Sequence, residues 1–277
     1  MRSRRNSSRR GTVPNGTRAH CTGSQHKDLP IGGRPTLTER YRSQLAVTSL
    51  AIACSLWGSN FLFSKLAFAE LPVSHVVLLR FTLASLALLP AVIVHRVWPQ
   101  LQDLPLFILT GFLTVPVNYL LLYQGLALTS ATSAALLSGG LPVLFALAAA
   151  WFLHERLSTL EWLAVGASTL GVALIVGPLS SGHHWLGNAL VLVSLFATVA
   201  WVMLSKRLLA RYSAQVATAY IFMFGTLTLL PISLLWDGSL QLSLSSGVWA
   251  SVLALGFICT ALPYALWNWG LQYVTMS

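Results

Sequence analysis

Eight long apolar segments, separated by short polar connections, follow one another after residue 43. They span residues 44–66, 73–95, 104–124, 130–153, 159–177, 185–206, 214–235 and 248–272. A helix of about 20 apolar residues is long enough to cross the ~30 Å hydrocarbon core of a bilayer. Because every backbone amide in lipid needs an internal hydrogen-bond partner, such segments must be helical. The pattern predicts an all-α, polytopic integral membrane protein with eight transmembrane helices.

The last three segments resemble a restart of the first three. Ser64-Lys65 and Leu88-Leu89-Pro90 recur 141 positions later as Ser205-Lys206 and Leu229-Leu230-Pro231, and Tyr119 and Gly125 recur 145 positions later as Tyr264 and Gly270. This repetition divides the chain into a first unit of five helices, residues 44–177, and an incomplete second unit of three helices, residues 185–277.

The basic charge of the chain is concentrated in the first 43 residues. The chain has 17 Lys and Arg against 7 Asp and Glu, and ten of the basic residues but only two of the acidic ones lie in residues 1–43. This stretch is rich in Arg, Ser, Gly and Thr and lacks hydrophobic periodicity, so it is predicted to be a disordered basic tail. An organellar transit peptide is an alternative interpretation. The basicity belongs to the tail, so it does not indicate a nucleic-acid partner.

Lys and Arg are also distributed unequally between the two sets of connections. With the N-terminus in the cytoplasm, Arg96, Arg156 and the cluster of Lys206, Arg207 and Arg211 all lie on the cytoplasmic side. The opposite connections, 67–72, 125–129, 178–184 and 236–247, contain no Lys or Arg. Because basic loops stay inside, the sequence predicts a multi-pass protein of the cytoplasmic (plasma) membrane with a cytoplasmic N-terminus.

Two basic residues lie within the apolar segments. A cation in hydrocarbon costs several kcal/mol unless it pairs, reaches the interface or faces a cavity. Lys65 is near a helix end, where it either extends outward and pairs with Glu70 or was carried there by an inverted duplication. Arg80 is deeper, and we expect it to line a cavity and favour anionic groups such as a carboxylate, or to serve a buried partner.

Polar and aromatic residues concentrate in the first helix and in the third helix of each unit. Prolines there kink the helix axis, and amides in lipid need a partner helix or a wet cavity. The predicted substrate-binding residues are Trp57, Asn60, Arg80, Asn118, Tyr119, Tyr264, Trp267 and Asn268. Hydrogen bonding between helices is the alternative role for these residues. Gly139, Gly140 and Pro142 predict a helix break that could serve gating.

No pattern in the chain predicts catalysis or a bound cofactor. Phosphate-binding loops, nucleophile elbows and paired intramembrane carboxylates are absent from the sequence, and His183-His184 has no neighbouring carboxylate to complete a metal site. Three widely spaced cysteines predict no disulfide framework. The expectation is therefore a protein that is not an enzyme and has no cofactor and no metal.

Several motifs, taken in order, resemble the EamA-type branch of the drug/metabolite transporter superfamily. They are Trp57-Gly58-Ser59-Asn60-Phe61, Leu79-Arg80-Phe81, the run from Tyr123 to Ala131, Leu141-Pro142-Val143, Glu155-Arg156-Leu157, Gly166 and Gly171. The resemblance covers essentially all of residues 44–277. It implies a ten-helix exporter of small metabolites, built from two five-helix inverted repeats, that needs no ATP.

The resemblance also sets the functional expectation. A small metabolite, amino-acid-like or drug-like, would be exported by alternating access as one half rocks against the other, with small-molecule substrate and lipid as partners. The family pattern would continue past Ser277 with two further helices of about 50 residues in all, so the chain looks truncated. A non-transporting remnant or assembly subunit is the alternative, and a membrane-embedded enzyme is a further rival. Oligomeric state is not predicted.

Overall fold

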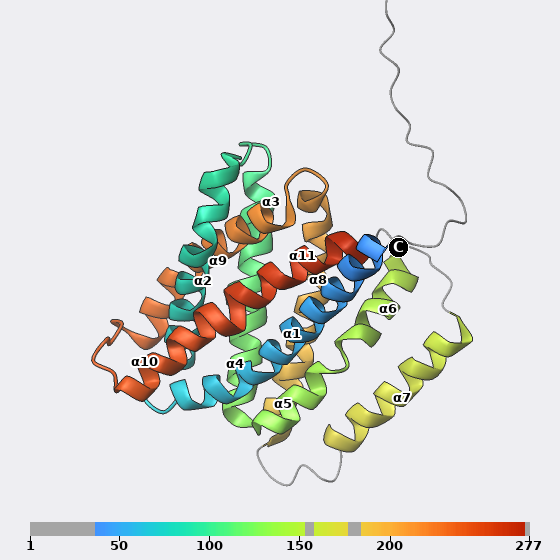
Figure 1. Cartoon of the computed structure of the whole chain (residues 1–277). Helices are drawn as coiled ribbons and strands as arrows, with labels where there is room; N and C mark the ends of the chain where they lie inside the picture. The colour runs from blue at the N-terminus through green and yellow to red at the C-terminus, as the bar shows by residue number, and fades with distance from the viewer. Residues whose placement is uncertain (1–36, 153–157, 177–183, 275–277) are drawn as a thin grey trace, which may run out of the picture.

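The computed structural model of the protein describes residues 37–152, 158–176 and 184–274, which form a bundle of helices (Figure 1). In chain order the elements are α1 (Leu37–Ala67), α2 (Val73–His95), α3 (Leu104–Phe112), η1 (Leu113–Tyr119), α4 (Leu120–Leu128), α5 (Ala131–Ser138), α6 (Leu141–Phe152), α7 (Thr159–Val176), α8 (His184–Leu209), α9 (Ala214–Asp237), α10 (Ser246–Leu253), η2 (Ala254–Ala261) and α11 (Leu262–Val274). The described residues contain no strand, and the predicted all-α class is confirmed.

Seven helices in the described ranges are long and apolar enough to cross a membrane. Two of these spans, Leu104–Leu128 and Ser246–Gly270, are each continuous through a π-helical segment, which is η1 in the first and η2 in the second. The fifth predicted segment, residues 159–177, forms α7, whose apolar run Trp162–Gly171 is shorter. The chain is therefore a multi-pass integral membrane protein, and the helix count agrees broadly with the sequence prediction.

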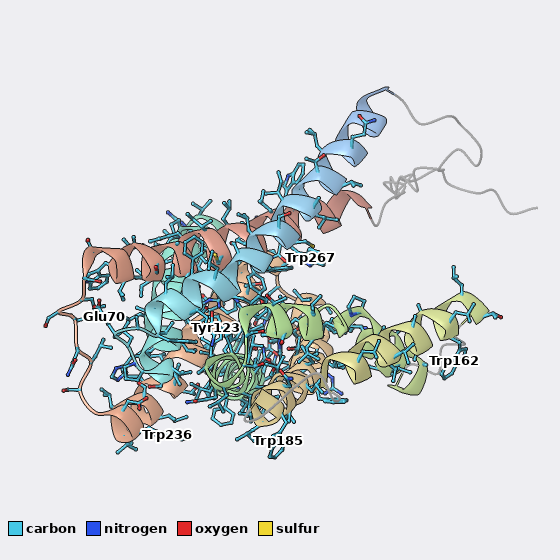
Figure 2. The ribbon with its side chains drawn as sticks, turned by 90° about the horizontal axis from the view of Figure 1, so that it is seen from below. Glu70, Tyr123, Trp162, Trp185, Trp236 and Trp267 are labelled. Carbon is cyan, nitrogen blue, oxygen red and sulfur yellow. The ribbon has the colours of Figure 1, made fainter. Side chains whose placement is uncertain are left out.

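The outer surface of the bundle is apolar, as a lipid-facing surface must be. Large hydrophobic side chains such as Leu62, Leu86 and Leu227 are more than half exposed along their helices. Trp185 and Trp236, near helix ends, are also exposed and lie at the periphery in Figure 2. Tryptophans at helix ends match the aromatic belt expected at a membrane interface.

Two boundaries differ from the sequence prediction. The first helix begins at Leu37, so it includes the last residues of the stretch that was predicted to be a disordered tail up to residue 43. The fourth predicted segment is split, because α5 ends at Ser138 and α6 begins at Leu141. The rest of the predicted tail and the Glu155-Arg156 connection lie outside the described residues.

Glycines allow the third span of each sequence unit to approach the other unit at backbone distance. A Cβ added to Gly111 in α3 would lie 2.7 Å from the Ile221 carbonyl oxygen of α9, and one added to Gly256 in η2 would lie 3.3 Å from the Arg80 carbonyl oxygen of α2. Small residues permit such close helix packing in membranes.

A second pair of glycine contacts follows the same arrangement. A Cβ added to Gly125 in α4 would lie 2.9 Å from the Val191 nitrogen of α8, and one added to Gly270 in α11 would lie 2.9 Å from Leu50 Cγ of α1. Figure 1 shows α11 lying beside α1. In each pair of contacts the two glycines are 145 positions apart, and the two residues that they approach are 141 positions apart. These are the two offsets found in the sequence.

We expect Gly125→Ala to destabilise the protein, because the new methyl group would lie 2.7 Å from the Gly187 carbonyl oxygen. Overpacking of this kind costs about 1–3 kcal/mol. Thermal unfolding in detergent measures the loss. Gly166→Ala in α7 is the matched control, since a Cβ there meets nothing within 4 Å; an equal melting temperature for both variants would contradict the close packing.

Candidate substrate-binding site

Arg80 of α2 is almost completely buried, with 1% of its surface exposed. Its guanidinium donates from Nε to Thr260 Oγ1 at 2.6 Å and from Nη1 to Asn60 Oδ1 at 2.6 Å. Nη1 also donates to the Tyr123 hydroxyl, which itself donates to Asn60 Oδ1 at 2.6 Å. These four residues, here called the Arg80 cluster, join α1, α2, α4 and η2, and Figure 2 shows Tyr123 inside the bundle.

The backbone of η2 explains how this segment presents two acceptors to the arginine. Pro263 has no N–H, so it cannot make the usual helical hydrogen bond to the Cys259 carbonyl. Arg80 Nη2 donates to that carbonyl at 3.4 Å. The Thr260 hydroxyl donates to the Leu255 carbonyl at 2.6 Å, which leaves its oxygen free to accept from Arg80. π-Helical segments are frequent at functional sites.

Aromatic rings surround the guanidinium on its remaining sides. The Arg80 Cζ atom lies 4.8 Å from the ring centroid of Tyr119, 5.4 Å from that of Phe81 and 5.5 Å from that of Tyr123. Cation–π attraction at such distances contributes roughly 0.5–2 kcal/mol per contact. The rings therefore hold the arginine in place and stabilise part of its charge.

Every hydrogen-bond partner of Arg80 in the part of the chain that the structure describes is neutral. The partners are one amide, two hydroxyls and one carbonyl. A buried cation costs several kcal/mol to desolvate, and neutral hydrogen-bond partners offset this cost without neutralising the charge. Arg80 is thus a buried, preorganised cation without a carboxylate partner among the described residues.

A group of aromatic side chains, here called the aromatic wall, extends from the Arg80 cluster along α1 and α11. The Trp57 ring lies 5.3 Å from that of Tyr264 and 5.3 Å from that of Trp267. Tyr264 also contacts Phe222 at 5.0 Å, and Phe222 contacts Phe81 at 4.9 Å. The three residues of the wall are half-buried, and they form an apolar surface next to a buried cation.

Five of the eight predicted binding residues belong to these two groups: Asn60 and Arg80 to the Arg80 cluster, and Trp57, Tyr264 and Trp267 to the aromatic wall. The ring of a sixth, Tyr119, packs against the Arg80 guanidinium.

The other two predicted residues bond to neighbouring helices. Asn118 Oδ1 accepts from Thr198 of α8 at 2.9 Å, and Asn268 Nδ2 donates to Thr218 of α9 at 3.4 Å. Their contacts match the alternative role of hydrogen bonding between helices.

The remaining sequence expectations have mixed outcomes. Gly139 and Gly140 form the turn between α5 and α6, with Pro142 in the first turn of α6; a gating role stays a prediction.

Lys65 Nζ donates to the Ala127 carbonyl at 3.3 Å, and Glu70 accepts from the Ser245 backbone at 2.8 Å. The alternative pairing of Lys65 with Glu70 is therefore not formed.

Sequence reasoning missed two members of the Arg80 cluster. Tyr123 lies four residues after Tyr119, on the same helix face, which was a usable signal. Thr260 carried no comparable signal, because its approach to Arg80 depends on the packing of η2 against α2.

The membrane-spanning helices define a polytopic membrane protein, and its interior holds an enclosed polar site. The model of the EamA-like transporter family matches residues 44–177 and 185–277, and the chain belongs to this family. The resemblance predicted from the sequence is confirmed. The family, together with the names of its relatives, indicates a transporter and not an enzyme.

Similar proteins cover most of the chain. An uncharacterized transporter of Archaeoglobus fulgidus is 30% identical over 80% of this chain and 78% of its own length. The uncharacterized transporter YetK of Bacillus subtilis is 26% identical over 83% and 72%. A probable terminal-alkyne amino-acid exporter of Streptantibioticus cattleyicolor is 27% identical over 84% and 78%. One protein of known crystal structure, at 18% identity, has the same fold with a TM-score of 0.61 over 82% of this chain and 79% of that one.

Proposed function

We propose that this protein is a secondary transporter that exports a small amphipathic carboxylate, such as an amino acid, by alternating access across the cytoplasmic membrane. The observation that carries the proposal is Arg80, a buried cation whose described partners are all neutral. Arginine matches the planar geometry of a carboxylate through paired N–H groups.

The arrangement around Arg80 supports roles for its neighbours. The carboxylate of the substrate would bind Arg80 and the amide of Asn60, with Tyr119 and Tyr123 closing over it. The side chain of the substrate would lie along Trp57, Tyr264 and Trp267. A relative named as a probable amino-acid exporter supports a substrate of this class.

We further propose that the end of the bundle carrying Arg96, Lys206, Arg207 and Arg211 faces the cytoplasm. This end is called the basic end below. The orientation follows from the retention of basic loops on the inner side, and it places the start of α1 at the cytoplasmic surface.

Counterflow in proteoliposomes tests the transport function without ATP. We expect vesicles preloaded with unlabelled L-phenylalanine to accumulate the radiolabelled amino acid, because its aromatic ring fits the aromatic wall. Empty liposomes are the control. If the folded protein exchanges neither phenylalanine nor any other standard amino acid, the result favours the non-transporting alternative.

A further inference from the structure

We propose that the units which move against each other are not the two sequence units but two bodies that have exchanged their third spans. Body A consists of α1 and α2 with α10, η2 and α11. Body B consists of α8 and α9 with α3, η1 and α4. The inference rests on the alternating access proposed above, and it changes which helices move together.

The close glycine contacts all lie within these bodies. Gly111 and Gly125, from the first sequence unit, contact the backbones of α9 and α8 in the second. Gly256 and Gly270, from the second unit, contact α2 and α1 in the first. Gly111, Gly125 and Gly256 meet backbone atoms of the neighbouring helix, and Gly270 meets side chains of α1. Helices packed this closely resist sliding, since packed interfaces switch between discrete arrangements and do not deform continuously.

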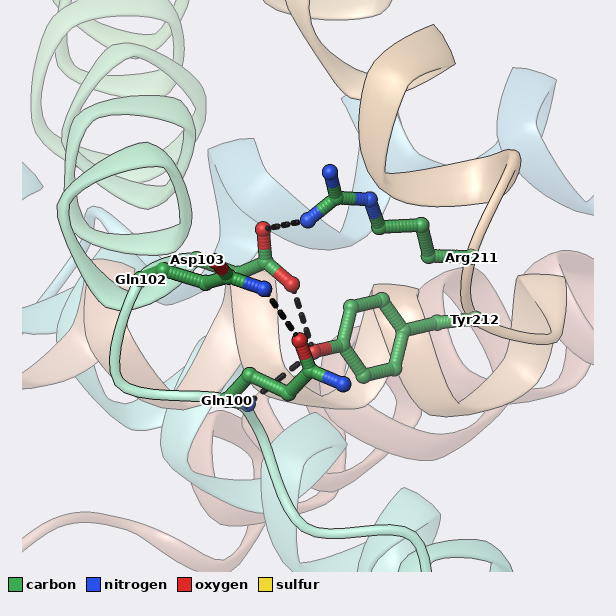
Figure 3. Close-up of polar contacts among 5 residues, drawn as sticks. All are labelled: Gln100, Gln102, Asp103, Arg211 and Tyr212. Carbon is green, nitrogen blue, oxygen red and sulfur yellow. Dashed lines mark hydrogen bonds and ion pairs between the residues drawn. The ribbon is translucent and has the colours of Figure 1, made fainter.

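A polar clasp fixes the exchanged span of body B at the basic end (Figure 3). Asp103, which precedes α3 and is 6% exposed, accepts from Arg211 Nη1 at 2.6 Å and from the Tyr212 hydroxyl at 2.8 Å. The Tyr212 hydroxyl also accepts from the Gln100 backbone N–H at 3.0 Å. The Phe107 ring of α3 lies 5.2 Å from that of Tyr212, and burial raises the pKa of this tyrosine.

A corresponding contact fixes the exchanged span of body A at the opposite end. Glu70, between α1 and α2, accepts from the backbone N–H of Ser245 at 2.8 Å, and Ser245 caps α10. Hydrogen bonds from Ser245 lower the pKa of Glu70, which favours the ionised carboxylate that accepts them. Glu70 lies 141 positions before Arg211, so the two clasps occupy equivalent places in the two bodies.

Hydrogen bonds at other depths also join the exchanged span of body B to its new neighbours. Thr129, immediately after α4, donates to Asn188 of α8 at 2.7 Å, and both residues are buried. Thr198 of α8 donates to Asn118 of η1 at 2.9 Å. Body B is therefore held by glycines, polar bonds and a clasp along the length of the span.

Contacts between the two bodies run through side chains. Helix α2 of body A packs against α9 of body B, and hydrogen bonds cross from Ser74 to Asp237 and from Asn268 to Thr218. Aromatic side chains make the central contacts, with Phe81 of body A 4.6 Å from Tyr119 and 4.9 Å from Phe222 of body B. Towards the end opposite the basic one, Lys65 of body A donates to the Ala127 carbonyl of body B at 3.3 Å. None of the close glycine contacts in the described residues crosses this boundary. Side chains can change rotamer, so this interface can rearrange without forcing close-packed backbones apart.

The division places the substrate site across the moving interface. Arg80, Asn60 and Thr260 belong to body A, whereas Tyr119 and Tyr123 belong to body B. Separation of the bodies would remove the Tyr123 hydroxyl from Arg80 Nη1, leaving that N–H group free for a carboxylate. The cation would thus become available to substrate only when the interface opens.

Two cross-links distinguish movement of the two sequence units from movement of bodies A and B. One link joins the two sequence units within a single body, and the other joins the two bodies within a single sequence unit. Cysteines at Asp103 and Arg211 join different sequence units within body B. Cysteines at Lys65 and Ala127 join one sequence unit across the two bodies. Each pair is introduced with Cys21→Ser and Cys54→Ser and linked by a short, reducible bis-methanethiosulfonate reagent.

Counterflow of radiolabelled L-phenylalanine is measured before linking, after linking and after reduction. We expect the 103–211 link to leave the rate within about twofold and the 65–127 link to reduce it at least tenfold, with recovery on reduction. Loss of flux with the 103–211 link, and retention with the 65–127 link, would show that the sequence units rock and would overturn the inference.

Hydrogen–deuterium exchange decides the matter without a substrate. The 65–127 link should slow amide exchange along the facing parts of α1 and α4, and the 103–211 link should leave it unchanged; the reverse pattern would overturn the inference. If the unlinked protein shows no phenylalanine counterflow, the proposed substrate class fails. The hydrogen–deuterium exchange data still test whether bodies A and B move against each other.

Discussion

Replacing Arg80 by glutamine is expected to raise the half-saturating concentration for L-phenylalanine counterflow roughly 10- to 150-fold. Hydrogen bonds to a charged group contribute about 1.5–3 kcal/mol, and 1.4 kcal/mol corresponds to a factor of ten in affinity. Arg80→Lys should recover only part of the loss, because an ammonium group cannot reproduce the planar fork of a guanidinium.

Lys65→Ala is the matched control for Arg80→Gln, since it also removes a cation from a membrane helix. Among the described residues Lys65 bonds to a backbone carbonyl at the edge of the interface, so its loss should change the half-saturating concentration by less than about threefold. Size-exclusion profiles and melting temperatures of all variants confirm folding. Equal counterflow by the wild type and Arg80→Gln would assign the arginine a purely structural role.

Asn60→Asp should stabilise the protein and abolish its affinity for carboxylates. Asn60 Oδ1 lies 2.6 Å from Arg80 Nη1, so the nearly isosteric aspartate would supply the counterion that the described residues lack. An internal carboxylate at this distance would compete directly with that of the substrate. We expect a higher melting temperature in detergent and a loss of phenylalanine counterflow of at least about tenfold, equivalent to 1.4 kcal/mol.

Asn188→Asp makes the same change at a buried amide whose described side-chain partner is Thr129 and not an arginine. This control should lower the melting temperature, because it introduces an uncompensated buried charge. If Asn60→Asp and Asn188→Asp destabilise the protein equally, Arg80 does not lack a counterion and does not attract a carboxylate.

The helices were predictable because lipid imposes a simple rule on the sequence. A span such as 73–95 is recognisable from its length and hydropathy alone, and it forms α2 with the predicted bounds. The start of α1 at Leu37 could not be predicted in this way. Residues 37–43 are mostly polar, and they extend a helix whose formation depends on the apolar part that follows.

The site could be predicted in part, for reasons that differ between residues. Arg80 stood out because a cation at that depth needs an explanation, and Asn60 and Tyr119 because polar groups are rare in lipid. Thr260 did not stand out, since a threonine hydroxyl normally bonds within its own helix, and only the packing of η2 against α2 brings it to the guanidinium.

The exchange of the third spans could not be read from the sequence. A repeat with offsets of 141 and 145 shows that two units are similar, but similarity does not say which helix of one packs on which helix of the other. The glycines at 111, 125, 256 and 270 were visible. Their partners became known only from the three-dimensional arrangement.

Competition during counterflow tests most directly the central claim, that a buried arginine binds the carboxylate of the substrate. Uptake of radiolabelled L-phenylalanine is measured with an excess of unlabelled 3-phenylpropionate, which keeps the carboxylate, or of phenethylamine, which keeps the amine. We predict that 3-phenylpropionate inhibits uptake by the wild type and that phenethylamine does not. Inhibition by phenethylamine, with none by 3-phenylpropionate, would show that the site recognises a cation and would contradict the role given to Arg80.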